Sequence, residues 1–161
     1  MNAAGTVIIA ALIGTWFAYP KHSAAANGMP PAVAKAFLAW QEQCGPSGEA
    51  EFTEDYLTVL DIDGDGDPDY ILNGDGATCV ENGRVVARGG GNGGTSLMIF
   101  TRQGQAVSEA LDVFTQGAEI RAHKGFASVT TVEGTTLRIA GDKATKSRSI
   151  TGGRVVYTLG R

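Results

Sequence analysis

The stretch DIDGDGDPDY, residues 61–70, constrains the fold of this chain more than any other feature. Aspartate stands at every second position, at Asp61, Asp63, Asp65, Asp67 and Asp69, with glycine, isoleucine and proline between. Two carboxylates held a few ångströms apart repel each other by roughly 1 to 4 kcal/mol, depending on how wet the site is. A bound dication would reverse the sign of that energy. The stretch therefore predicts a cation site, with a water-solvated acidic turn as the alternative.

The spacing of the aspartates matches a calcium-coordination frame that begins at Asp61. Calcium takes six to eight oxygen ligands at about 2.3 to 2.6 Å, and a short loop supplies them if its side chains converge. With Asp61 first, Gly66 falls sixth, where the loop must turn sharply, whereas a start at Asp63 puts Pro68 there. We expect the backbone carbonyl of Asp67 to be one ligand. Four residues are expected to contribute side-chain oxygens: Asp61, Asp63, Asp65 and Asp69.

The residues around this frame distinguish it from an EF-hand. Leu72 occupies the twelfth position, where an EF-hand carries glutamate, and β-like residues flank the loop on both sides. The loop resembles instead the D-x-[DN]-G-D-G-x-P-D-[LY] calcium loop of FG-GAP and VCBS repeats, found in integrin-type β-propeller blades. This resemblance implies Ca²⁺ as the bound ion. It covers residues 61–70 alone, and because the loop has no second copy, a propeller is not implied.

The first residues of the chain have the order of a secretory signal peptide. An apolar block from Thr6 to Tyr19 precedes the small residues Ala24, Ala25 and Ala26. The block is shorter than the ~20 apolar residues that span a bilayer comfortably. We expect cleavage after Ala26, which makes residues 1–26 a signal peptide and residues 27–161 a single domain in the periplasm or outside the cell. The alternative is an uncleaved membrane anchor.

Two cysteines remain after this cleavage, Cys44 and Cys79. In an exported protein an even pair predicts a disulfide, which stabilises by about 3 to 4 kcal/mol in the chain-entropy model. The alternative is two buried thiols. The chain also resembles, more loosely, a group of small uncharacterised secreted proteins of proteobacteria. The shared feature is the order of segments: export signal, helix with cysteine, strand, acidic loop, second cysteine and glycine-rich stretch. This resemblance implies export and calcium, and no known activity.

Charge is distributed unevenly along the chain. Between Lys35 and Arg84 there are twelve acidic residues and no basic one, whereas from Arg84 onward eleven Lys and Arg face five Asp and Glu. The basic residues are scattered singly, without the basic stripe and interleaved aromatics that nucleic-acid binding needs. We therefore expect no nucleic-acid partner, and a membrane partner only if the signal is uncleaved; the envelope or extracellular ligand is not identified by the sequence.

Hydrophobic periodicity predicts one N-terminal helix followed by an antiparallel β meander, an α+β fold. Val33, Phe37, Trp40 and Cys44 form one helical stripe after Pro30 and Pro31. The β-like segments 56–62 and 70–72 flank the acidic loop. Hairpin turns are expected at four pairs: Asn82-Gly83, Gln103-Gly104, Glu133-Gly134 and Gly152-Gly153. The glycine-rich stretch 89–94 precedes a strand rather than a helix, so we expect a flexible surface loop and no nucleotide site.

Catalytic patterns are weak in this sequence. The single histidine after cleavage, His123, has no sequence context that indicates a Ser/His/Asp site. Five of the acids cluster in a frame that requires them ionised, whereas glycoside hydrolysis needs one acid kept protonated. We expect an exported calcium-binding structural or binding module. The alternative is a secreted hydrolase of envelope polysaccharide or phosphate esters.

Overall fold

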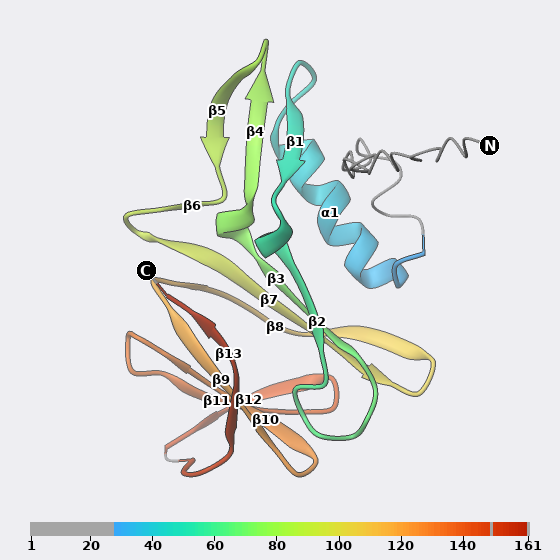
Figure 1. Cartoon of the computed structure of the whole chain (residues 1–161), viewed down its shortest axis with the longest axis vertical. Coiled ribbons are helices and arrows are strands. Elements are labelled where there is room, and N and C mark those ends of the chain that lie inside the picture. The colour runs from blue at the N-terminus through green and yellow to red at the C-terminus, as the bar shows by residue number, and fades with distance from the viewer. Residues whose placement is uncertain (1–27, 149, 161) are drawn as a thin grey trace, which may run out of the picture.

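The computed structural model describes residues 28–148 and 150–160 (Figure 1). Within these ranges the chain forms one α-helix, two short 3-10 helices and thirteen strands. The helices are α1 (Pro31–Gln43), η1 (Glu54–Tyr56) and η2 (Gly74–Gly76). The strands are β1 (Glu49–Phe52), β2 (Leu57–Leu60), β3 (Asp69–Asn73), β4 (Ala77–Glu81), β5 (Arg84–Arg88), β6 (Gly90–Gly91), β7 (Gly94–Gln103), β8 (Ala106–Thr115), β9 (Ala118–His123), β10 (Phe126–Thr131), β11 (Thr136–Ala140), β12 (Lys143–Ser147) and β13 (Arg154–Leu159). The predicted combination of a helix with antiparallel strands is confirmed, and the fold is rich in β-structure.

Helix α1 forms over the predicted stripe. Pro30 is its N-cap and Pro31 its first residue, a position where the missing N–H of proline costs no hydrogen bond. Val33 and Phe37 are buried on the predicted face and Trp40 is half-buried. Gly45, with a φ of 74°, follows the last turn in the left-handed conformation that glycine adopts easily.

No helix in residues 28–148 or 150–160 has both the length and the apolar character needed to cross a bilayer. The predicted signal peptide, residues 1–26, and its alternative as an anchor lie outside the described residues.

Two five-stranded antiparallel sheets enclose the larger core. One contains β2, β3, β7 and β6, with β8 paired along β7; the other has the order β12-β11-β10-β9-β13. Fully buried side chains from both sheets form one cluster, including Ile71, Ile99, Ile120, Val129 and Ile139. Burying each such side chain contributes about 1.5 to 3 kcal/mol before the entropy of ordering it is counted. The two sheets therefore form a sandwich.

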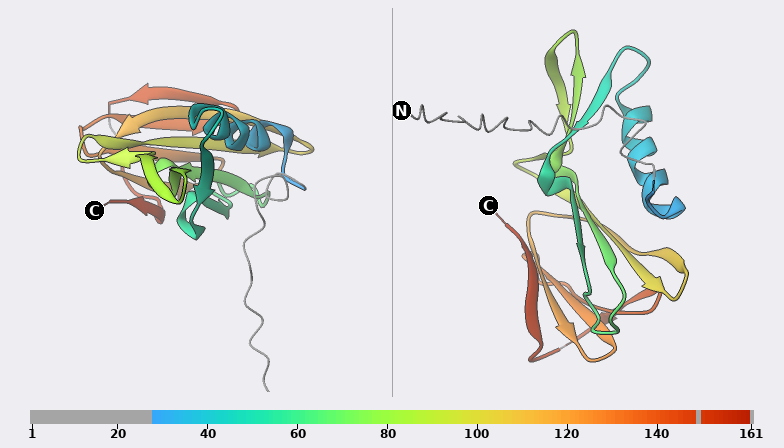
Figure 2. Two further views of the ribbon diagram at one scale, coloured as in Figure 1. Left: turned by 90° about the horizontal axis from the view of Figure 1, so that it is seen from above. Right: turned by 45° about the vertical axis from the view of Figure 1, so that its right-hand side comes forward.

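Helix α1 covers the opposite face of the first sheet. Successive strand residues point to opposite faces, so Leu72 and Phe100 lie away from the sandwich core. They form a second buried cluster with Val33 and Phe37 of α1 and with Tyr56 of η1. The molecule thus has three layers, with the helix on one sheet and that sheet on the other (Figure 2).

A small sheet of β1, β4 and β5 projects from one end of the molecule (Figures 1 and 2). The predicted disulfide is present: Cys44, just after α1, is bonded to Cys79 of β4, with their Cα atoms 5.2 Å apart. Gln41 of α1 forms hydrogen bonds with backbone groups at the start of β1. Its side-chain amide donates to the Gly48 carbonyl and accepts from the Ala50 N–H. Helix and small sheet are therefore joined by a covalent bond and by two hydrogen bonds.

The predicted meander is wrong at three pairings, because β1 pairs with β4, β3 with β7 and β13 with β9, and none of these pairs is consecutive in the chain. Strand β13 does not form a hairpin with β12 across Gly152-Gly153; it pairs with β9, at the opposite edge of the sheet. This position buries Leu159 of β13 in the core beside Ile120. The other predicted turns fall between paired strands, the first of them with positive φ at Asn82 and Gly83, as a tight hairpin requires.

The expectation of a flexible loop at residues 89–94 is also wrong. Gly89 donates its N–H to the Ala77 carbonyl, and Gly90–Gly91 form strand β6. A Cβ on Gly89 would lie 2.5 Å from the ring of Trp40, and one on Gly90 would overlap the Asp75 carboxylate. Glycine is required at these two positions because other elements pack directly against the backbone.

Glu133 ties the connection between β10 and β11 to the end of β8. Its carboxylate accepts hydrogen bonds from the Gln116 N–H and the Thr115 hydroxyl, both at 2.7 Å. These bonds lower the pKa of Glu133 from 4.5 to about 2. The folded state therefore binds this proton more weakly than the unfolded state, and the stabilisation is present above pH 4.5 and lost as the pH falls toward 2.

We expect Glu133→Gln to lower the melting temperature by a few degrees at pH 7 and by less at pH 2.5. Thermal melts at the two pH values measure this, with Glu109→Gln, an exposed acid on β8, as the matched control. An equal effect of Glu133→Gln at both pH values would contradict the assigned role.

Candidate metal centre

The acidic stretch forms the connection between β2 and β3, residues 61–68. Leu60 pairs with Asp69, so the connection leaves and re-enters the first sheet at adjacent positions. It lies at the end of the molecule opposite the small β1-β4-β5 sheet (Figure 1). Gly64 and Gly66 have φ of 77° and 94°, which only glycine adopts without strain. The two glycines thus allow the loop to fold back on itself.

Three carboxylates converge inside this loop. One oxygen each from Asp61, Asp63 and Asp65 lies within 4.8 Å of the others. Backbone N–H groups hold these side chains: Asp61 accepts from Gly64 at 2.7 Å and from Gly66 at 3.0 Å. Asp63 accepts from the N–H of Asp65, and Asp65 from that of Asp67, at 3.2 and 2.8 Å. The loop is therefore wrapped around its own carboxylates.

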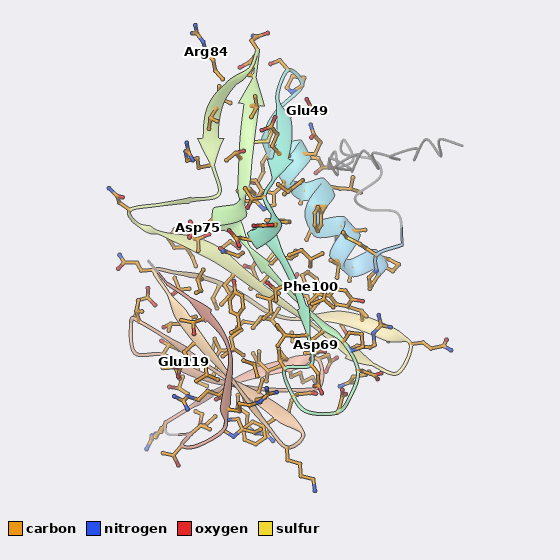
Figure 3. The ribbon with its side chains drawn as sticks, viewed as in Figure 1. Glu49, Asp69, Asp75, Arg84, Phe100 and Glu119 are labelled. Atoms are coloured by element: carbon orange, nitrogen blue, oxygen red, sulfur yellow. A yellow bond between two sulfur atoms is a disulfide. The ribbon has the colours of Figure 1, made fainter. Side chains whose placement is uncertain are left out.

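Asp69 has a different environment from these three residues. It is fully buried, and its oxygens accept hydrogen bonds from the Ile62 N–H at 3.0 Å and the Arg102 N–H at 2.8 Å. Figure 3 labels it where strand β3 begins. Burial raises the pKa of Asp69 to about 6, although the two hydrogen bonds act in the opposite direction. Asp69 thus fastens the start of the loop to strand β7.

The loop also contacts the second sheet of the sandwich. The Gly125 N–H, in the turn between β9 and β10, donates to the Asp63 carbonyl at 2.8 Å. Gly64 lies against the backbone of His123, where an added Cβ would approach the carbonyl oxygen to 2.9 Å. Ile62 is fully buried in the core between the sheets. The acidic loop is therefore held by both sheets, and its conformation is linked to their packing.

The electrostatics of the loop are unfavourable without a cation. Burial raises the pKa of the Asp63 carboxyl, and the nearby charges of Asp65 and Asp61 raise it further. The converging atoms are all carboxylate oxygens, the ligand type that hard divalent cations prefer. The donor chemistry of the loop therefore fits a hard cation such as calcium or magnesium.

The structure brings together three of the five predicted site residues, Asp61, Asp63 and Asp65. Asp67 is half-exposed and donates its N–H to Asp65. Asp69 engages the backbone in a way that the sequence reasoning did not anticipate. The contacts of Arg102 and Gly125 with the loop were also missed; Lys124-Gly125 is a turn signal, but nothing in it indicates a contact with residue 63.

Comparison of the chain with models of protein families, with curated proteins and with solved structures finds no match.

Proposed function

We propose that this protein is an exported calcium-binding structural or binding module of the periplasm or cell surface. The observation that carries the proposal is the convergence of the Asp61, Asp63 and Asp65 carboxylates within 4.8 Å of one another in a loop that contacts both sheets. The proposed role of the ion is to hold this loop, and with it the packing of the sandwich.

Calcium is proposed over magnesium because of the number and type of donors. Besides the three converging side chains, the frame supplies the Asp67 carbonyl and the Asp69 carboxylate. Each carboxylate oxygen has two lone pairs, so the hydrogen bonds that Asp69 accepts leave it able to bind a cation. Magnesium demands a small octahedron and keeps several waters, which suits such a loop less well. The resemblance to FG-GAP and VCBS loops favours the same ion.

Export is supported by the disulfide. Bonds of this kind form and persist in oxidising compartments such as the periplasm and the extracellular space. The Cys44–Cys79 bond is consistent with the predicted signal peptide.

Calcium should raise the thermal stability of the protein. Extracellular calcium modules have dissociation constants of about 10⁻⁴ to 10⁻³ M, so about 10 mM calcium stabilises the folded state by about 1.4 to 2.7 kcal/mol. For a chain of this size we expect a melting temperature about 5 to 10 °C higher in calcium than in excess chelator. Differential scanning calorimetry in the two buffers, at equal ionic strength, measures it.

Matched variants assign this response to the loop. Asp65→Ala should abolish the calcium-dependent shift, because it removes a converging carboxylate. Asp67→Asn should keep the shift, since the carbonyl of this residue is the proposed ligand. Asp142→Asn, in an exposed turn far along the chain, controls for the loss of one charge. Equal melting temperatures of the parent protein in calcium and in chelator would refute the proposal.

A further inference from the structure

A cavity of about 500 Å³ lies between η1, η2 and the end of strand β13. Its lining includes Glu54 and Asp55 of η1, Asp75 of η2, the buried Asn73, and Tyr157 of β13. Figure 3 labels Asp75 and Asp69. Asp69 begins strand β3, whereas Asp75 lies just after the last residue of that strand, at its other end. The volume is in the range of small-molecule sites, roughly 300 to 1,000 Å³. The cavity is therefore separate from the acidic loop.

The charged groups that line this cavity are all acidic. Glu54, Asp55 and Asp75 contribute carboxylates, and no Lys, Arg or His is among the described residues of the lining. The remaining polar groups are hydroxyls and an amide, including those of Thr58 and Asn73. A site of this composition attracts a cation and repels an anion.

The arrangement of the three carboxylates disfavours a single metal ion. In the described part of the chain, the acidic side chains that converge closely enough to share a metal are those of Asp61, Asp63 and Asp65. The cavity acids Glu54, Asp55 and Asp75 are not such a group, so their three carboxylates do not converge on one point. Such a distribution suits a larger cation, with its charge dispersed over several atoms.

Two further lining residues point to an organic cation. Asn73 is 8% exposed and its side-chain oxygen accepts the Asp75 N–H at 3.0 Å, which fixes a polar group in the cavity wall. Tyr157 is half-buried and lines the same cavity as Asn73. Burial, followed by the charges of Asp55 and Asp75, raises the pKa of Tyr157, so the phenol stays neutral. A neutral tyrosine ring beside carboxylates attracts an alkylammonium group through its π-electrons.

We propose that this cavity binds a small organic ammonium ion, held by the carboxylates of Glu54, Asp55 and Asp75 and by the ring of Tyr157. The hydroxyls and the amide of the lining would bind polar groups carried by the same ligand.

Choline and its uncharged analogue 3,3-dimethylbutan-1-ol test the proposal, because they have nearly the same shape and differ in charge. NMR titration of the calcium-loaded protein at constant ionic strength should show saturable shifts for choline at residues around the cavity. The uncharged analogue should give none. Equal binding of the two compounds, or saturation by neither, would overturn the proposal, as would displacement of choline from the cavity by added calcium.

Variants identify the groups responsible. Tyr157→Leu should weaken choline binding about 3- to 30-fold, and Tyr157→Phe, which keeps the ring, should weaken it much less. Asp55→Asn should weaken binding about two- to fivefold, whereas Asp142→Asn, an equal charge change outside the cavity, should leave it unchanged. The spectrum of each variant without choline establishes that it is folded. If Asp142→Asn has the same effect as Asp55→Asn, the attraction is due to net charge and the cavity is not a site.

Discussion

Replacing both Cys44 and Cys79 by serine should lower the free energy of unfolding by about 4 kcal/mol. The bond joins residues 35 apart in sequence, and closing a loop of that length removes about this much conformational free energy from the unfolded chain. The same bond holds the end of α1 against β4. Without it, the small sheet keeps the hydrogen bonds of Gln41 to Gly48 and Ala50 and its packing on α1.

Urea denaturation measured by circular dichroism tests this prediction. The double variant avoids the unpaired thiol that a single substitution leaves. The oxidised parent protein is the reference, and the parent treated with a reductant should lose stability to a similar extent as the double variant. A loss below about 1 kcal/mol would show that the unfolded chain is not constrained by this bond in the way that the loop-closure model requires.

Asp69→Asn should destabilise the protein by about 2 kcal/mol, although the substitution changes the side-chain shape very little. Both oxygens of Asp69 accept backbone N–H groups, from Ile62 and from Arg102, in a fully buried position. Asparagine keeps one acceptor and turns a donor toward the other N–H, which is left buried without a partner. Leaving such a group unsatisfied costs about 1 to 3 kcal/mol, and removing a buried charge, whose burial raises the pKa of Asp69, offsets part of that cost.

The metal dependence of this loss separates the two roles of Asp69. Chemical denaturation of Asp69→Asn should show most of the loss in excess chelator as well as in calcium, because the two N–H groups lose their acceptor in either case. Asp67→Asn is the matched control, with the same chemical change two residues away on a half-exposed side chain. Destabilisation that occurs in calcium and disappears in chelator would mean that Asp69 acts as a metal ligand alone.

The turn sequences show that local patterns predict the backbone conformation of a turn but not the pairing of the strand that follows it. Asn82-Gly83 forms a hairpin turn because both residues adopt positive φ, and this depends on nothing beyond the two residues and their flanking strands. Gly152-Gly153 has an equally good local signal, and both glycines do have positive φ. The following strand nevertheless pairs with β9, where Leu159 enters the core. A turn sequence permits a reversal but does not decide which strand the chain meets next.

The residues that line the cavity could not be predicted from local sequence patterns either. Glu54, Asp55 and Asp75 are unremarkable members of the acidic part of the sequence, and Tyr157 lies in its basic part. They line one space because η1, η2 and β13 meet there. No spacing in the sequence relates these residues, so a search for motifs does not find them.

The sequence by itself determined the local turns of the acidic loop. The hydrogen bonds that shape it join Asp61 to Gly64 and Gly66, Asp63 to Asp65, and Asp65 to Asp67, all within a few residues, and the glycines supply the required φ values. The tertiary structure alone decided the environment of Asp69, whose partner Arg102 is 33 residues away, and the contact of Asp63 with Gly125. The physical reason is that local hydrogen bonds depend on neighbours in the chain, whereas distant contacts follow from which strands pair and which apolar faces are buried together.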